Sequence, residues 1–116
     1  MWLRHATPMG NLPSIKRRGL DPKQSRGHQE VVWLHRPSRT AWALLHTQQR
    51  HHTSDVIVID VNVPRSWVQR RRCGLWTCRR TIEPHRLSRW YAIDELIAEE
   101  QAVVRPSVVD DDGCAC

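Results

Sequence analysis

The chain has 116 residues, a length at which we expect one ordinary domain with a modest hydrophobic core. Its 18 Lys and Arg residues outnumber its 12 Asp and Glu residues, which leaves a formal net charge of +6. No run approaches the roughly 20 apolar residues of a membrane span, and the first residues lack the apolar core of a signal peptide. A cytoplasmic protein without a membrane segment is therefore expected.

Aromatic and basic residues are used unevenly. Phe is absent and Tyr occurs once, but there are six Trp residues, so we expect a core built around Trp. Nearly all of the positive charge is Arg, whose planar fork of donors binds phosphate in a bidentate manner. This favours a nucleotide or nucleic-acid partner. A GC-rich genome, which encodes Arg wherever a cation suffices, is the alternative explanation.

The first elements are a strand and a helix. Residues 2–6 have the mixed apolar and polar character of a short strand, and Pro, Gly and Asn then interrupt it. Asn11 is suited to cap a helix over residues 12–18, in whose first turn Pro13 is tolerated. Gly19 is expected to end this helix in a left-handed conformation.

A polar loop, two strands and a helix are expected next. Residues 21–30 contain Pro and Gly among polar residues, which is typical of a loop. Residues 31–35 are β-branched and aromatic, which predicts a strand. Ser38 is suited to cap a helix through about residue 46. Residues 56–63 hold a run of β-branched apolar residues, which predicts a central strand covered on both faces.

The rest of the chain predicts a helical turn, a strand and a helix. The turn covers residues 64–72, the strand covers 75–82, and the helix covers 89–102 because its apolar residues recur at helical spacing. We therefore expect a single α+β domain over residues 1–104. Residues 105–116 are acidic and contain Gly and Pro, which predicts a flexible tail.

Two places in the first half could carry chemistry. His5 and Thr7 form an H-x-T at the end of the first strand, although a His there is most often only partly exposed and satisfied. Trp33 and His35 are two residues apart in a strand and point to one face, so Trp33 could stack on a flat ring while His35 bonds beside it. If Trp33 is a core residue instead, His35 needs a buried partner.

The third place is near the end of the last predicted strand. Arg79 and Arg80 would point to opposite faces of that strand, so only one of them could face a site. Glu83 and His85 follow, where a carboxylate could orient a ribose hydroxyl or activate a nucleophile. A solvated, charged edge is the alternative interpretation of this segment.

Other site classes lack their motifs. The sequence contains no phosphate-binding glycine loop, no nucleophile elbow and no zinc-protease motif. Cys73 and Cys78 are spaced unlike a zinc knuckle, whether taken alone, with His85 or with the pair His51–His52. No metal is therefore expected.

Several segments taken together resemble the ADP-ribosyltransferase superfamily. They are L-R-H-A-T (3–7), N-L-P-S-I-K-R-R-G-L (11–20), V-V-W-L-H (31–35), V-I-V-I-D-V (56–61) and I-E-P-H-R-L (82–87). The order is similar to that of the compact branch that includes tRNA 2′-phosphotransferases and ADP-ribosyltransferase toxins. The likeness covers roughly residues 3–90. It implies a small, split and strongly curved β-sheet with flanking helices, and NAD or an ADP-ribosylated phosphate intermediate in the cleft.

The resemblance also implies roles for individual residues. His5 would bond the ribose on the nicotinamide side, with Thr7 beside it, and Trp33 or His35 would flank the nicotinamide. In a transferase chemistry, Glu83 would orient the ribose, although its segment does not clearly match the family's late glutamate. In a phosphotransferase chemistry, a phosphate would be held by His and Arg side chains: Arg26, His28, His35, and Arg79 or Arg80.

The sequence therefore predicts an NAD-dependent ADP-ribosyltransferase-like enzyme with a nucleic-acid or protein acceptor, such as a toxin or a phage or defence effector. Its expected catalytic residues are His5, His35 and Glu83, and its ligand is NAD or an ADP-ribosyl nucleotide. The expected cofactor-binding residues are His5, Thr7, Arg26, Trp33, Arg79 and Arg80. The alternative is a non-catalytic basic module that binds nucleic acid or a protein on the same fold.

Overall fold

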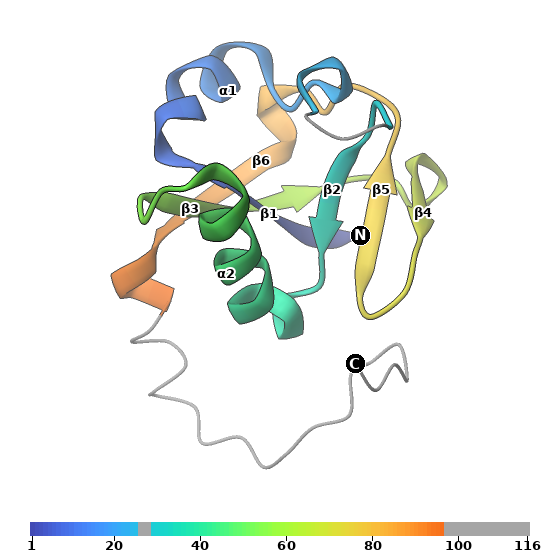
Figure 1. Cartoon of the computed structure of the whole chain (residues 1–116). Coiled ribbons are helices and arrows are strands. Elements are labelled where there is room, and N and C mark those ends of the chain that lie inside the picture. Colours follow the sequence, from blue (N-terminus) through green and yellow to red (C-terminus); the bar gives the residue numbers. More distant parts are fainter. Residues whose placement is uncertain (26–28, 97–116) are drawn as a thin grey trace.

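The computed structural model describes residues 1–25 and 29–96. They form a curved, open, six-stranded sheet with helices packed against it, so the predicted α+β class is confirmed (Figure 1). Every strand pair is antiparallel and the order is β4-β5-β2-β1-β3-β6. The strands are β1 (Trp2–Pro8), β2 (Val32–His35), β3 (Val56–Asn62), β4 (Val68–Arg70), β5 (Leu75–Cys78) and β6 (Leu87–Ala92).

Two α-helices are complete within the described residues, α1 (Leu12–Arg18) and α2 (Thr40–His51), and residues 93–96 are also helical. None of the helices in the described part is long and apolar enough to cross a membrane. Short 3-10 turns join the elements: Met9–Asn11, Pro22–Gln24, Pro37–Arg39, Arg65–Trp67 and Pro84–Arg86.

Strand β3 lies inside the sheet, as its apolar run predicts. It pairs with β1 along seven positions, from Trp2 opposite Asn62 to Pro8 opposite Val56, and with β6 on its other edge. Successive side chains point to opposite faces of a strand, and both faces of β3 are covered. Ile59 belongs to the main core cluster, whereas Val58 belongs to a second cluster.

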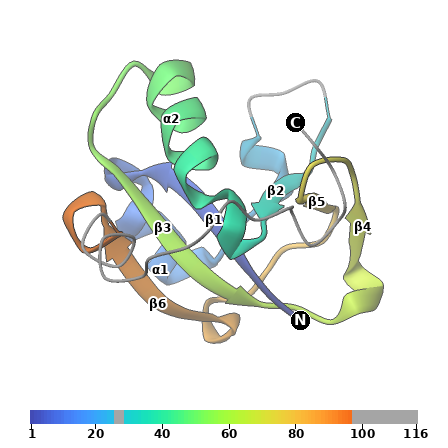
Figure 2. The ribbon, with the colours of Figure 1, turned by 90° about the horizontal axis from the view of Figure 1, so that it is seen from below.

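The two helices cover opposite faces of this part of the sheet (Figure 2). Ile15 of α1 packs into the main cluster together with Ile59. Leu44 of α2 packs against the second cluster, which contains Val58 and Tyr91. Each helix therefore contributes apolar side chains to one layer of the core.

Strands β1 and β2 are paired over only a short distance. Their one register pair joins Arg4 to His35, although β1 continues to Pro8 and β2 begins at Val32. Beyond Arg4 the two strands therefore diverge. The sheet opens between them while β1 remains fully paired with β3 on its other side.

The predicted helix over residues 89–102 is wrong in its first part. Residues 87–92 form β6, in which Trp90 lies opposite Ile59 and Tyr91 opposite Val58. This segment forms a strand despite its helical spacing because the outer edge of β3 needs backbone hydrogen-bond partners, which the segment supplies. Helical conformation begins at Ile93. Residues 97–102 and the predicted tail at 105–116 lie outside the described residues.

Two neighbouring predictions also need correction. The segment 64–72 contains a single 3-10 turn followed by strand β4, because Val68 pairs with β5 and is buried. The predicted strand 75–82 ends at Cys78, and Ile82 forms only an isolated bridge with Leu20. The bridge ties the segment after β5 to the end of α1.

Capping and the choice of core residues differ from expectation as well. Ser38 lies in a 3-10 turn and α2 begins at Thr40, while Asn11 makes no side-chain cap for α1. The core is mainly aliphatic: Trp76 is buried, but Trp33 is 41% exposed and Trp42 is 41% exposed. Aliphatic residues on β3 supply the inner surface that we had expected from Trp.

Candidate functional site

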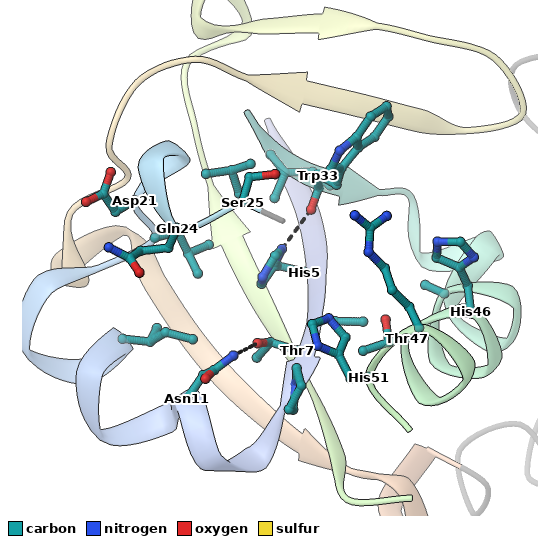
Figure 3. A pocket seen from close by; sticks show the side chains of 18 of the residues that line it. His5, Thr7, Asn11, Asp21, Gln24, Ser25, Trp33, His46, Thr47 and His51 are labelled. Carbon is teal, nitrogen blue, oxygen red and sulfur yellow. Dashed lines mark hydrogen bonds between the residues drawn. The ribbon is translucent and has the colours of Figure 1, made fainter. Parts of the chain in front are cut away.

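A cleft of about 1500 Å³ lies where β1 and β2 diverge (Figure 3). The outer half of β1 and the residues of β2 form its floor. The turn Met9–Asn11 and α1 form one wall, and one face of α2 forms the opposite wall. The cleft is therefore a direct consequence of the short β1–β2 pairing, with one helix on each side of the opening.

His5 lies at the centre of the cleft and spans the gap between the two strands. Its Nδ1 is 2.7 Å from the backbone oxygen of Trp33. A carbonyl oxygen can only accept a hydrogen bond, so Nδ1 carries the proton in this contact. The imidazole thus satisfies a backbone carbonyl of β2 that the diverging strand β1 cannot reach.

The electrostatic surroundings keep the His5 ring neutral. Burial lowers the pKa of His5, the hydrogen bond to the Trp33 carbonyl opposes this, and the nearby His51 lowers it further. A neutral ring protonated at Nδ1 has an unprotonated Nε2. The cleft therefore contains an imidazole nitrogen that can accept a hydrogen bond or a proton.

Thr7 is two residues further along β1 and points to the same face as His5. Its hydroxyl oxygen accepts a hydrogen bond of 3.1 Å from the Asn11 side-chain amide. Thr7 is 5% exposed and lines the cleft. Asn11, predicted to cap the helix, therefore orients the Thr7 hydroxyl instead.

Trp33 and His35 both line the cleft but differ in exposure. Trp33 is exposed at the rim, so the interpretation of Trp33 as a core residue is wrong. His35 is 3% exposed, and its Nε2 has no hydrogen-bond partner among the described residues. Burial, together with the positive charge of neighbouring groups that include Arg4, lowers the pKa of His35 to about 3.

A helix was predicted in the region of α2, but its contribution to the cleft was not. The rings of Trp42 and His46 stack with centroids 4.9 Å apart and planes 8° from parallel. Arg50 follows four residues after His46 and also lines the cleft, as do Thr47 and His51. A spacing of four residues places side chains on one face of a helix. The spacing of Trp42, His46 and Arg50 was therefore a signal in the sequence that could have identified this wall.

Several residues expected at the site lie elsewhere. Glu83 is exposed on the turn before β6, where its carboxylate contacts Arg86 at 3.2 Å and His85 at 3.7 Å. Arg79 and Arg80 follow the end of β5 and do not line the cleft. The strand alternation expected for these two arginines does not apply because they are outside any strand. Arg26 and His28 lie outside the described residues.

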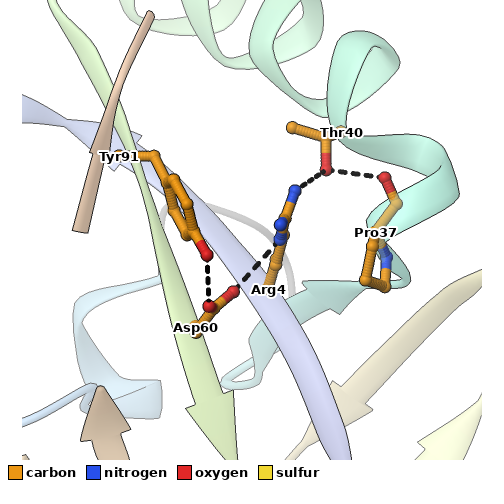
Figure 4. Close-up of polar contacts among 5 residues, drawn as sticks. All are labelled: Arg4, Pro37, Thr40, Asp60 and Tyr91. Carbon is orange, nitrogen blue, oxygen red and sulfur yellow. Dashed lines mark hydrogen bonds and ion pairs between the residues drawn. The ribbon is translucent and has the colours of Figure 1, made fainter. Parts of the chain in front are cut away.

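Behind the floor, polar contacts connect the sheet to the start of α2 (Figure 4). Arg4 contacts the Asp60 carboxylate at 3.1 Å and donates to the Thr40 hydroxyl at 3.1 Å. Thr40 in turn donates to the Pro37 carbonyl, and Tyr91 donates to Asp60 at 2.6 Å. Burial and the Asp60 carboxylate raise the pKa of Tyr91. These contacts link β1, β3 and β6 to α2 and so hold one wall of the cleft in place.

The cleft contains both cationic and anionic side chains, with Asp21 and Asp55 among the residues that line it. Within the described ranges, no group of three or more His, Cys, Asp or Glu side chains is arranged to hold a metal ion. The cleft also offers a neutral imidazole, an oriented hydroxyl, two exposed indoles, and the cations Arg18 of α1 and Arg50 of α2. Comparison of the sequence with protein-family models and with curated proteins gives no match.

Proposed function

We propose that the chain is an NAD-dependent ADP-ribosyltransferase-like enzyme that acts on a nucleic-acid or protein acceptor. The observation that carries the proposal is the neutral His5 at the centre of the cleft, whose Nδ1 donates to the Trp33 carbonyl. Its Nε2 is an acceptor for a ribose hydroxyl, which is the role that the family resemblance implies for this residue. The opened sheet accounts for the position of the histidine, because the ring fills the gap between β1 and β2.

The cleft has the size and the groups for a dinucleotide. Its volume of about 1500 Å³ exceeds the range of roughly 300–1,000 Å³ that is usual for pockets of single small molecules. Trp33 and Trp42 are each 41% exposed and line the cleft, where a nicotinamide or an adenine could stack on an indole, although one face of Trp42 is already stacked on His46. Arg18 and Arg50 are cations on the two walls, and a pyrophosphate between them would be stabilised by their charge.

The residues in the cleft favour an acceptor that is already an anion. Bound NAD would supply a ribosyl carbon whose bond to nicotinamide is broken during transfer. Glu83, the carboxylate expected to assist that step, lies outside the cleft. A phosphate acceptor needs no deprotonation, so it requires only cations and hydrogen-bond donors to hold it. This supports the phosphotransferase chemistry over the one that depends on Glu83.

Calorimetric titration with NAD tests the proposal. The wild-type chain should bind NAD with a Kd in the micromolar to millimolar range, and His5→Ala should remove measurable binding because the ribose contact is lost. Trp42→Ala, a change at an exposed position, should weaken binding by about tenfold through loss of stacking. His85→Ala is the matched control, because this histidine is exposed on the turn before β6.

Circular dichroism should first establish that the His5→Ala variant is folded, since this change also leaves the Trp33 carbonyl without its partner. The proposal is wrong if the wild-type chain gives no heat with NAD, with ADP-ribose or with RNA that carries a phosphorylated end. Release of nicotinamide, followed by chromatography, then separates an enzyme from the alternative. Binding of NAD without turnover on any acceptor would instead favour the non-catalytic module.

A further inference from the structure

Outside the cleft, positive charge gathers at the β4–β5 end of the sheet. The segment from residue 64 to residue 82 contains no Asp or Glu. We call its arginines the arginine surface: Arg65, Arg70, Arg71, Arg72, Arg79 and Arg80. Arg72, Arg79 and Arg80 are exposed, and none of the three forms an ion pair with a carboxylate of the described residues. Unpaired like charges at this density create a positive potential that attracts a polyanion.

Two arginines of this surface, Arg65 and Arg80, are in contact with aromatic rings. The guanidinium of Arg80 lies 4.2 Å from the ring centroid of Trp67, and that of Arg86 lies 4.4 Å from the same ring. Arg65 lies 4.7 Å from the ring centroid of Trp76. A contact with an aromatic ring orders the side chain without neutralising its charge. Arg65 and Arg80 are therefore ordered by contacts that leave their positive charge in place.

A shallow hollow of about 260 Å³ lies on this surface. Trp67, Arg79, Thr77 and Gln69 are among the residues that line it. Because Arg79 is at its edge, an anionic group placed in the hollow would meet a guanidinium fork that no described carboxylate occupies. The hollow thus gives the surface a specific place for a phosphate.

One row of cross-strand partners joins the hollow to the cleft. Trp33 of β2 lies opposite Thr77 of β5, and Thr77 lies opposite Gln69 of β4. Residues opposite each other in adjacent strands share a face of the sheet. Two strand spacings of about 4.8 Å each separate the ends of the row. The backbones of Trp33 and of Gln69, which lines the hollow, are therefore about 10 Å apart, and their side chains share a face.

We infer that the arginine surface binds the phosphodiester backbone of a single-stranded nucleic acid, whose bases reach the exposed indole of Trp33 at the cleft. Planar guanidinium groups match phosphate geometry, and an exposed indole stacks only on bases that are unpaired. The spacing of about 10 Å lets one short stretch of chain engage both places. Where the inference concerns catalysis it rests on the proposed function: if the cleft holds NAD, the acceptor is a nucleic acid.

Binding of fluorescently labelled oligonucleotides, measured by anisotropy over a range of salt concentrations, tests the inference. Single-stranded RNA, single-stranded DNA and a duplex of equal length are compared with the wild-type chain. Arg79→Gln/Arg80→Gln should weaken single-strand binding by about 20-fold at 0.1 M salt and lower the slope of log K against log salt by about 1.4. Both values follow from about 0.7 per lost phosphate contact on a single strand. Arg72→Gln should lower the slope by about 0.7.

The matched control is Arg17→Gln/Lys23→Gln, which removes two charges from exposed positions on α1 and the turn after it. It should leave the slope unchanged. Equal losses in the two double variants would overturn the inference, as would duplex binding tighter than single-strand binding. Absence of oligonucleotide binding at about 50 mM salt would also overturn it, because phosphate contacts are strongest at low salt. Equally tight binding of a labelled poly-glutamate peptide would show that charge alone is recognised and would overturn it too.

Calorimetry with NAD keeps the two proposals separate. Arg79→Gln/Arg80→Gln should bind NAD like the wild-type chain, because neither arginine lines the cleft. If oligonucleotides bind as expected but NAD does not, the proposed function fails and the nucleic-acid surface stands. If NAD binds and oligonucleotides do not, only the surface fails.

Discussion

At the scale of single residues, two histidines occupy unusual environments for different reasons. His5 is held by a backbone carbonyl that the diverging strands leave exposed to its ring. His35 is buried in the one β1–β2 register pair, opposite Arg4, and the positive charges of Arg4 and Arg39 lie near it. In both, burial is the main cause of a lowered pKa. Both rings are therefore neutral at pH 7, which suits hydrogen bonding in the cleft.

The lowered pKa of His35 predicts a loss of stability in acid. Its pKa falls from an ordinary value of 6.5 to about 3 in the folded chain, so between these values only the unfolded chain binds the proton. The free energy of unfolding should therefore fall as pH decreases from about 6.5 toward 3, by about 1.4 kcal/mol per pH unit from this group. Urea unfolding at several pH values should show a shallower fall in His35→Gln.

The matched control for this measurement is His85→Gln. The side chain of His85 is 72% exposed, and its replacement should leave the wild-type dependence on pH. A His35→Gln variant whose stability falls with acid as steeply as that of the wild-type chain would contradict the prediction.

At the scale of elements, the end of α1 depends on one glycine. Gly19 has a φ of +79°, and its backbone lies against Ile82, whose carbonyl accepts a hydrogen bond from Leu20 at 2.9 Å. A side chain at position 19 would meet both a strained backbone conformation and the Ile82 carbonyl. The close approach of α1 to the segment before β6 therefore requires a residue without a Cβ atom.

Gly19→Ala should accordingly destabilise the chain by about 2 kcal/mol or more, since the new Cβ overlaps backbone atoms that cannot move aside easily. Gly10→Ala is the control, because no heavy atom lies within 4 Å of the Cβ that it would add. Chemical denaturation of both variants measures the difference. Equal stabilities of the two variants would show that the bridge between Leu20 and Ile82 can adjust.

At the scale of the whole molecule, the opened sheet still has one main core. The main cluster takes residues from strands on both sides of the gap, including Leu3 of β1, Leu34 of β2, Ile59 of β3 and Trp76 of β5. The cleft therefore interrupts the hydrogen bonding between β1 and β2 but not the packing beneath them. Both halves of the sheet depend on the same buried side chains.

A shared core predicts cooperative unfolding. Far-UV circular dichroism and tryptophan fluorescence should give the same midpoint in urea, because neither half of the sheet can lose its packing alone. Dilution of urea should restore both signals, which is the control for reversibility. Two separated midpoints would mean that the β4-β5-β2 part unfolds independently of β1 and β3.

Local sequence signals accounted for a part of the fold and of the site. The β-branched run of β3 predicted a central strand because its pattern is the same whatever surrounds it. Gly19 marked the end of α1 because its conformation is a local property. His5, Thr7, Trp33 and His35 were identified in advance, and all four line the cleft. Each of these residues lies on a strand whose position was also predicted.

Other features depend on partners that are distant in sequence, and local signals could not predict them. Residues 87–92 carry a helical spacing, yet they form β6 because the edge of β3 offers them hydrogen bonds. Glu83, Arg79 and Arg80 lie apart from the cleft because β5 ends early and the chain turns away from it. The α2 wall joins the site only because β1 and β2 diverge. Local conformation and the kinds of groups available could be inferred from nearby residues, whereas long-range strand pairing determined which of those groups meet.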